Sequence, residues 1–291
     1  MAVSFQRLAA VFLGGLLGAA GAFLLCGKST FPTGGEPTEG IPVPGIMYHN
    51  VLPDGSEGLG EYVVSASELE GDLQLLKEAG YEGVTPEELF DFVRGVGTLP
   101  EKPVLLTFDD GFESMEQVVL PLLQKYSFKA TAAIVGEYTD LYSGDVPKAL
   151  SYSHLSWEQC RELADSGLVE IANHTYGFHH LEDGRKGLRK KKGESEETYR
   201  KVLSDDLLLL QERCRDHLGK EPRALVYPYG FYSGESETLA EAFGFSVTVT
   251  CEEGVNFISN RKSLKKLKRY NRPHGADPDE FFKKAGIVGS P

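Results

Sequence analysis

The sequence contains little cysteine and no excess of positive charge, and both shortages narrow what this chain can be. Its 30 Lys and Arg residues are outnumbered by 43 Asp and Glu residues, for a formal net charge of −13. Binding to a phosphate backbone needs a basic surface, so nucleic acid is not an expected partner. Cys26 lies in an apolar run, and the other three, Cys160, Cys214 and Cys251, follow no C-x-x-C spacing. A disulfide framework and a zinc site built from cysteines are therefore both disfavoured.

Charge is missing altogether from one stretch near the start of the chain, LAAVFLGGLLGAAGAFLLC at 8–26. A helix rises about 1.5 Å per residue, so this run is just long enough to cross a hydrocarbon core of about 30 Å. A signal peptide has a shorter apolar region that ends in small residues, whereas Leu24 and Leu25 precede Cys26 here. We therefore expect an N-terminal membrane anchor at 1–28 with the remaining chain extracellular. A cleaved signal sequence, which would make the protein secreted, is the alternative.

The rest of the 291-residue chain is predicted to form a linker followed by one large domain. Residues 29–41 are rich in Gly, Pro and Thr, as linkers are. From 42 to 291, short apolar strands alternate with longer amphipathic segments. The strands are expected at 45–49, 103–108, 130–135, 168–173, 224–228 and 245–250. This alternation predicts an α/β fold with a parallel sheet, either open or closed into a barrel.

Helix starts can be read from capping boxes, in which two side chains satisfy free backbone N–H groups. Ser67 with Glu70, and Thr85 with Glu88, both have this spacing. Two further helices are expected at 156–167, which runs from a Ser to a Gly, and at 195–218.

Two segments are unusually charged. EDGRKGLRKKKGESEE at 182–197 has no apolar periodicity, so we expect a solvated surface loop; a site for an anionic partner is the alternative. RKSLKKLKRY at 261–270 is basic, with Leu264 and Leu267 three positions apart. It is expected to be a surface segment with a small packed stripe, and contact with an anionic surface polymer or lipid headgroups is the alternative.

Chemically active residues gather where the expected strands end. Asp109 and Asp110 follow one strand, HTYGFHH at 174–180 follows another, YPYG at 227–230 ends a third, and His49 ends the first. In parallel α/β folds the carboxyl ends of the strands form the functional rim. One aspartate and two histidines suit a divalent transition metal with an open position for water. The second aspartate of the pair is then free to accept a proton.

These motifs resemble a known family. TFDDGF (107–112), HTYGFH (174–179) and YPYG (227–230), in this order, are similar to those of the polysaccharide deacetylases of carbohydrate esterase family 4, the NodB homology domain. The resemblance extends over roughly 42–285 and implies a distorted (β/α)7 barrel, with 42–291 as the catalytic domain. It implies Asp109 as the general base, the Tyr229 backbone N–H as an oxyanion donor, and the metal ligands Asp110, His174 and His179. Zinc is the first choice of metal, with cobalt, nickel or iron as alternatives.

The opening PVPGIMYHN (42–50) resembles the permuted subgroup that deacetylates poly-N-acetylglucosamine. In that subgroup a histidine on this early strand is the general acid, which implies His49 here. His274, in RYNRPHG, is the alternative acid. No arginine stands beside YPYG, where many members have one that steers the base, and Arg272 is a possible substitute. Gly177 stands where relatives often carry Asp or Asn.

The resemblance implies a metal-dependent enzyme that removes N-acetyl groups from a surface or cell-wall polysaccharide containing N-acetylglucosamine. An O-acetyl esterase acting on a glycan, and a non-catalytic carbohydrate-binding module on the same barrel, are the alternatives.

Overall fold

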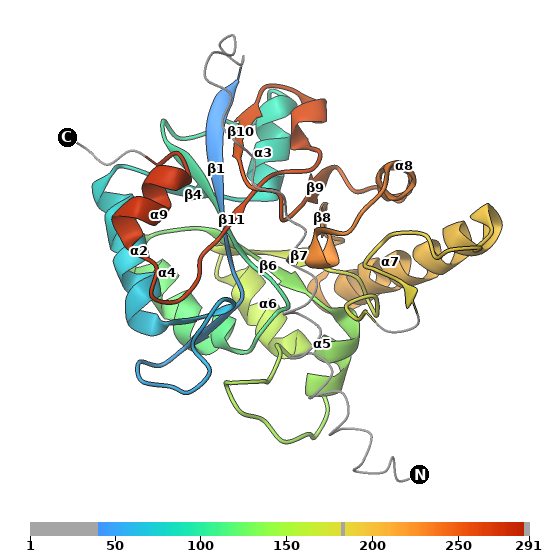
Figure 1. Ribbon diagram of the computed structural model, residues 1–291, viewed down its shortest axis with the longest axis horizontal. Helices are drawn as coiled ribbons and strands as arrows, with labels where there is room; N and C mark the ends of the chain where they lie inside the picture. The colour runs from blue at the N-terminus through green and yellow to red at the C-terminus, as the bar shows by residue number, and fades with distance from the viewer. Residues whose placement is uncertain (1–39, 182–183, 288–291) are drawn as a thin grey trace.

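The computed structural model describes residues 40–181 and 184–287 (Figure 1). Within these ranges no helix has both the length and the apolar character that a bilayer crossing requires. The expected anchor, and all but the last two residues of the expected linker, lie outside the described residues.

A single large sheet runs through the domain. Its main path has the order β10-β1-β5-β6-β7-β8-β9, while β4 pairs with β5 and β11 pairs with β1. The strands of the main path are β1 (Ile41–Tyr48), β5 (Pro103–Phe108), β6 (Ala130–Ile134), β7 (Val169–Asn173), β8 (Ala224–Val226), β9 (Val247–Val249) and β10 (Val255–Ile258). The two strands that branch from it are β4 (Glu82–Val84) and β11 (Tyr270–Asn271), and β2 (Asn50–Leu52) pairs separately with β3 (Val63–Ser65). All six expected strands are present, with ends shifted by a few residues.

The sheet closes into a barrel through the segment that leads into β11. Leu267 forms a parallel bridge with Val249 of β9, and three residues later Tyr270 pairs with Ile46 of β1. The ring therefore runs β1, β5, β6, β7, β8, β9 and the 267–271 segment, which agrees with the expected distorted (β/α)7 barrel. The closing segment was not expected to be a strand, because its basic sequence has no period-two pattern.

Helices surround this sheet in Figure 1. They are α2 (Ala66–Glu78), α3 (Pro86–Val93), α4 (Leu120–Tyr126), α5 (Gly136–Tyr142), α6 (Trp157–Asp165), α7 (Glu196–Leu218), α8 (Gly234–Ala242) and α9 (Pro278–Lys284). One buried cluster packs the sheet against apolar side chains such as Leu69 of α2, Leu163 of α6 and Phe282 of α9. A second cluster packs Leu203 and Leu207, nearer the start of α7, against Leu239 of α8.

Alternation along the strands separates an outer from an inner face. On β5, Leu106 and Phe108 belong to the cluster under the helices. Leu105 belongs instead to a cluster with Ala133 and Ala172 of the next strands, which forms the inside of the barrel. By the same alternation, the side chain of residue 107 on β5 points into the barrel. So do those of residues 109, 49 and 174, which directly follow β5, β1 and β7. Strand geometry alone thus aims Asp109, His49 and His174 toward one another.

Two of the expected helix starts need comment. The capping box at Thr85 and Glu88 is confirmed. The box expected at Ser67 and Glu70 is wrong: α2 starts two residues earlier, with Ser65 as N-cap and Glu68 as its partner. Both spacings fit the S-x-x-E pattern. The extended backbone of β3, which ends at Ser65, decides between them. The helices expected at 156–167 and 195–218 are confirmed as α6 and α7.

Each of the two charged segments contains a buried charged side chain in addition to its exposed residues. In 182–197, Leu188 and Arg185 are buried, and Arg185 forms an ion pair with Glu194 whose side chains are 5% and 8% exposed. Most of residues 184–197 are exposed, as expected of a surface loop, and these buried side chains fix part of it to the domain. In 261–270, Leu264 and Leu267 are buried as expected, but so is Arg269.

Candidate active site

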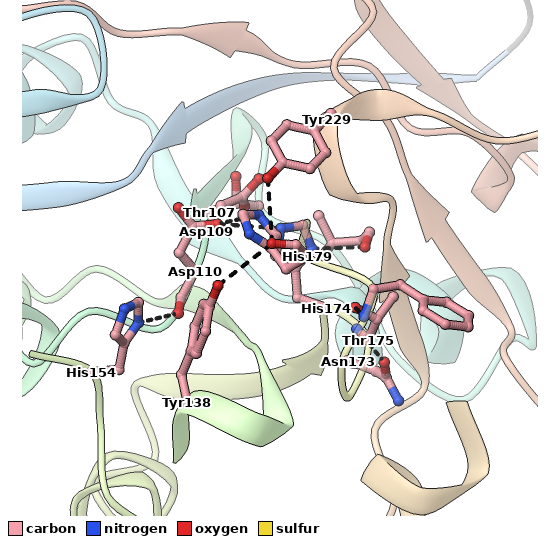
Figure 2. Close-up of polar contacts among 12 residues, drawn as sticks. Thr107, Asp109, Asp110, Tyr138, His154, Asn173, His174, Thr175, His179 and Tyr229 are labelled. Atoms are coloured by element: carbon pink, nitrogen blue, oxygen red, sulfur yellow. Dashed lines mark hydrogen bonds and ion pairs between the residues drawn. The ribbon is translucent and has the colours of Figure 1, made fainter. Parts of the chain in front are cut away.

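The inward-facing side chains meet at the carboxyl ends of β5 and β7, next to the loop that follows β8 (Figure 2). His179 Nε2 lies 2.9 Å and His174 Nε2 lies 3.4 Å from Asp110 Oδ1. Ligand atoms of these three residues all lie within 4.8 Å of one another. The structure thus brings together the three residues implied as metal ligands.

His174 has a defined tautomer. Its Nδ1 lies 2.8 Å from the carbonyl oxygen of Val226, and a carbonyl can only accept, so Nδ1 carries the hydrogen. Nε2 of the neutral ring then presents a lone pair toward Asp110. A histidine held through one nitrogen by a backbone carbonyl, with the other nitrogen free, is the usual arrangement for a metal ligand.

We tested whether a divalent cation suits this group. Asp110 Oδ1 is buried and accepts no well-directed hydrogen bond, even though two imidazole nitrogens approach it. Two nitrogen lone pairs and a carboxylate oxygen that face a common point repel one another, and a cation bound between them removes this repulsion. Burial raises the pKa of Asp110, but the neighbouring His179 and His174 outweigh it and hold that pKa well below its usual range. The residues fit a metal with nitrogen and oxygen ligands.

The backbone at the site is unusual. Asp110, Thr175 and Tyr229 have φ of 70°, 74° and 56°, a left-handed region that costs a non-glycine residue about 1–2 kcal/mol. For the β-branched Thr175 this is a true outlier. It is held by Asn173, whose Oδ1 accepts from Thr175 N at 2.8 Å, and by Gly136 N, which donates to the Thr175 carbonyl at 3.1 Å. Backbone strain of this kind concentrates at functional sites.

Asp109 is held by an arginine that we did not expect. Arg269 Nη1 and Nη2 donate to its two carboxylate oxygens at 2.6 and 2.8 Å, and Nη1 also donates to Thr107 Oγ1 at 2.7 Å. Both members of the pair are almost fully buried. Burial raises the pKa of Asp109, but Arg269 and His174 outweigh it, so the pKa is lowered and the carboxylate is ionised.

Arg272, the substitute suggested by the sequence, does not contact Asp109. It binds Asp72 of α2 instead, at 2.9 and 3.1 Å. The suggestion was wrong because barrel closure, which brings the 267–271 segment alongside β1 and β9, decides which arginine enters the site. The one sequence signal that could have identified Arg269 is its position two residues after Leu267, which continues the inward alternation.

The two histidines considered as general acid lie in different surroundings. His49 is partly buried, its ring packs edge-on against that of Tyr62 with centroids 4.8 Å apart, and its buried Nδ1 has no hydrogen-bond partner. Burial lowers its pKa, and the charges of Asp110 and Asp109 oppose that shift, so it faces both carboxylates. His274 is 40% exposed and its Nδ1 pairs with Glu68 at 2.7 Å. Only His49 is part of the group around Asp109 and Asp110.

Tyr229 lies on the other side of the histidine loop. Its ring packs on His179 with centroids 4.8 Å apart, and its hydroxyl donates to the His179 carbonyl oxygen at 3.4 Å (Figure 2). Tyr138 of α5 makes a similar contact with that carbonyl at 3.5 Å. The loop after β8 therefore supports His179 directly, in addition to any role of the Tyr229 backbone.

Gly177, the departure within the histidine motif, also has a structural explanation. Its N–H donates to Asp206 of α7 at 2.7 Å, and that of Tyr176 does so at 2.9 Å. A Cβ at position 177 would lie 3.6 Å from carboxylate oxygens of both Asp206 and Glu137. An acid placed there would crowd a third carboxyl group beside these two, and Asp206 already supplies from α7 the carboxylate that caps this loop.

Comparisons with known proteins show the family to which this chain is similar. The polysaccharide deacetylase family matches residues 96–248. The poly-beta-1,6-N-acetyl-D-glucosamine N-deacetylase of Escherichia coli strain K12 is 30% identical over 247 residues, which cover 78% of this chain but only 36% of that protein. The chain therefore spans about a third of the length of that relative.

Solved structures support the fold over most of the domain. A de-N-acetylase from Aggregatibacter actinomycetemcomitans superposes with a TM-score of 0.69 at 28% identity, covering 80% of this chain and 95% of that one. IcaB from Ammonifex degensii superposes with a TM-score of 0.66 at 26% identity, covering 86% and 97% of the two chains. With the family matched over more than half of its length, this chain belongs to the polysaccharide deacetylases and has their NodB-like barrel.

Proposed function

We propose that this protein is a metal-dependent deacetylase that removes N-acetyl groups from a polysaccharide containing N-acetylglucosamine. The observation that carries the proposal is the grouping of Asp110, His174 and His179 beside a second aspartate, Asp109, which a buried arginine keeps ionised. The name of the relative from E. coli favours this substrate class over other acylated compounds.

Asp110, His174 and His179 would hold the cation, zinc in the first instance and cobalt, nickel or iron otherwise. A divalent ion bound there supplies Lewis-acid chemistry, which polarises the acetyl carbonyl and makes water a better nucleophile. The remaining steps belong to the side chains around it.

Asp109 is the proposed general base. Arg269 orients both of its oxygens and stabilises the charged form, so the carboxylate is ready to take a proton from the attacking water. The Tyr229 N–H is the proposed donor to the oxyanion of the tetrahedral intermediate. His49, in its protonated form, is the proposed donor to the leaving amine. The neighbouring carboxylates favour that charged form and burial opposes it.

The same proposal includes a location outside the cytoplasm, at the membrane or secreted, which rests on the apolar run at 8–26 alone.

Acetate release tests the proposal directly. The protein would be stripped with a chelator and assayed with and without added Zn²⁺ or Co²⁺ on three substrates: β-1,6-linked N-acetylglucosamine oligomers, chitooligosaccharides and an O-acetylated glycan. We expect acetate from the N-acetylated oligomers only when metal is present. Faster release from the O-acetylated glycan would identify an esterase instead. Binding of the oligomers without acetate release under any metal would identify a carbohydrate-binding module.

A further inference from the structure

The turn that carries Asp110 has a conformation that the chain would not adopt unaided. Directly after β5, Asp110 and Gly111 have consecutive positive φ values of 70° and 68°. This double left-handed turn carries the Asp110 carboxylate to His174 and His179. Such a conformation persists only where surrounding contacts hold it.

A second segment, Ser153–Leu155, crosses this turn and binds it on both sides. Leu155 N donates to the Gly111 carbonyl and Glu113 N donates to the Ser153 carbonyl, each at 2.8 Å. Between these two bonds, His154 lies opposite Phe112 in an antiparallel bridge. The imidazole of His154 therefore projects toward Asp110.

His154 makes the contact that completes the turn. Its Nδ1 lies 2.9 Å from the carbonyl oxygen of Asp110 (Figure 2), and because a carbonyl only accepts, Nδ1 is the donor. The bond fixes the direction of the Asp110 carbonyl, and with it the backbone angles that aim the Asp110 side chain.

The ring of His154 is itself immobilised by aromatic neighbours. It stacks on Phe112 with centroids 4.7 Å apart, and Tyr138 and Tyr142 approach at 4.5 and 5.6 Å. A Cβ at Gly111 would lie 3.0 Å from Ile134 of β6, so a larger residue would not fit at this position of the turn.

We propose that His154 is a positioning residue for the cation site: it holds the Asp110 turn so that the Asp110 carboxylate faces His174 and His179. This inference rests on the proposed metal-dependent function. It concerns binding of the metal itself, so it is tested without any deacetylase assay.

The test compares cation affinity in full-length variants. An Asn side chain can place an N–H near the position of imidazole Nδ1, whereas Gln places it near Nε2, and Phe keeps only the stacking. Titration with Co²⁺, followed by visible absorption and by calorimetry, should give near wild-type affinity for His154→Asn. We expect affinities 10–100-fold weaker for His154→Gln and His154→Phe, the range found when residues that orient metal ligands are changed.

His217→Phe is a matched control. His217 also stacks on an aromatic ring, that of Trp157 at 4.6 Å, but it lies on α7 and contacts none of the three ligands. Its Co²⁺ affinity should equal that of the wild type. The rise in Tm on adding Co²⁺, which follows affinity, should shrink for His154→Gln and not for His217→Phe.

Wild-type Co²⁺ affinity in His154→Gln would overturn the proposal, as would equal weakening in His154→Asn and His154→Gln. The Asn and Gln variants decide the matter even if His154→Phe does not fold. Absence of Co²⁺ binding to the wild-type protein would refute the proposed metal-dependent function itself, which separates the two failures.

Discussion

Arg269 and Arg272 lie three positions apart, and each holds a buried aspartate with two hydrogen bonds. Arg269 binds Asp109 at 2.6 and 2.8 Å, while Arg272 binds Asp72 at 2.9 and 3.1 Å. Arg269 lies in the closing segment of the barrel and Arg272 directly follows it, and each pairs with an aspartate from a distant part of the chain. The two ion pairs are nearly equivalent in their hydrogen-bond distances and in the burial of their side chains.

Their surroundings differ because β1 separates them. His49 faces inward toward Asp109, whereas Tyr48 faces outward and donates its hydroxyl to Asp72 at 2.9 Å. The pKa of Asp72 is raised, since burial there outweighs Arg272, while the pKa of Asp109 is lowered with help from His174 and His49. A buried ion pair therefore indicates function only through the groups around it, and predictions that separate the two pairs follow, from the largest expected effect to the smallest.

Asp109→Asn should remove nearly all activity. The amide is a poor base, and positioned proton transfer contributes roughly 10²–10⁴-fold to rate. We expect kcat for acetate release to fall by about 10³–10⁴-fold, while metal content, measured by elemental analysis, stays at the wild-type level. Near wild-type turnover in this variant would show that Asp109 is not the base.

Asp72→Ala should instead reduce stability. Removing one partner of a buried ion pair typically costs about 3–5 kcal/mol, because the other charge is left behind. Arg272 keeps hydrogen bonds to the carbonyls of Pro273 and Ala276, so we expect the lower end, about 3 kcal/mol by urea denaturation. Activity per folded molecule should be unchanged. A large drop in kcat with intact stability would mean that this pair also serves the site.

The two histidines extend the comparison, because each lies beside one of the pairs. His49→Gln should lower kcat by roughly 10²-fold, as expected for loss of a general acid. His274→Gln, which changes a side chain bound to Glu68 at the surface, should leave kcat within about twofold of the wild type. If the two results were reversed, His274 would be the acid.

Glu170 is a buried acid whose hydrogen bonds come from Glu87 N and Thr85, without the bidentate arginine that the two aspartates have. Burial raises its pKa from 4.5 to about 7. The folded state therefore binds this proton more tightly than the unfolded chain does. The contribution of Glu170 to the free energy of unfolding is complete below pH 4.5 and is lost as the pH rises through 7.

Glu170→Gln should remove the loss of stability that ionisation of Glu170 causes at high pH, because the amide never ionises. We expect the variant to be about 3 kcal/mol more stable than the wild type at pH 8 and nearly equal to it at pH 4, by urea denaturation at both values. A constant difference across that range would show that Glu170 does not titrate there.

Much of the site could be predicted because strands have a period of two. Once 103–108 is a buried strand, residue 109 must continue its inward face, and the same holds for 49 and 174. The motifs were therefore recognisable from local patterns and spacing. Arg269 was missed, and Arg272 wrongly suggested, because neither has a local pattern: both lie in or just after the 267–271 segment, whose path depends on the strands it closes. The start of α2 was missed for a similar reason, since two Ser and Glu spacings overlapped.

The sequence by itself determined the α/β alternation, the rim on which Asp109, Asp110, His174 and His179 lie, and the family to which the chain belongs. These features are encoded within runs of a few residues, by apolar periodicity and by fixed motif spacing. Only the tertiary structure decided which arginine holds the inward aspartate, which histidine faces it, and that His154 binds the turn of Asp110. Each of these contacts joins residues far apart in the chain, and barrel closure and loop packing bring them within hydrogen-bonding distance.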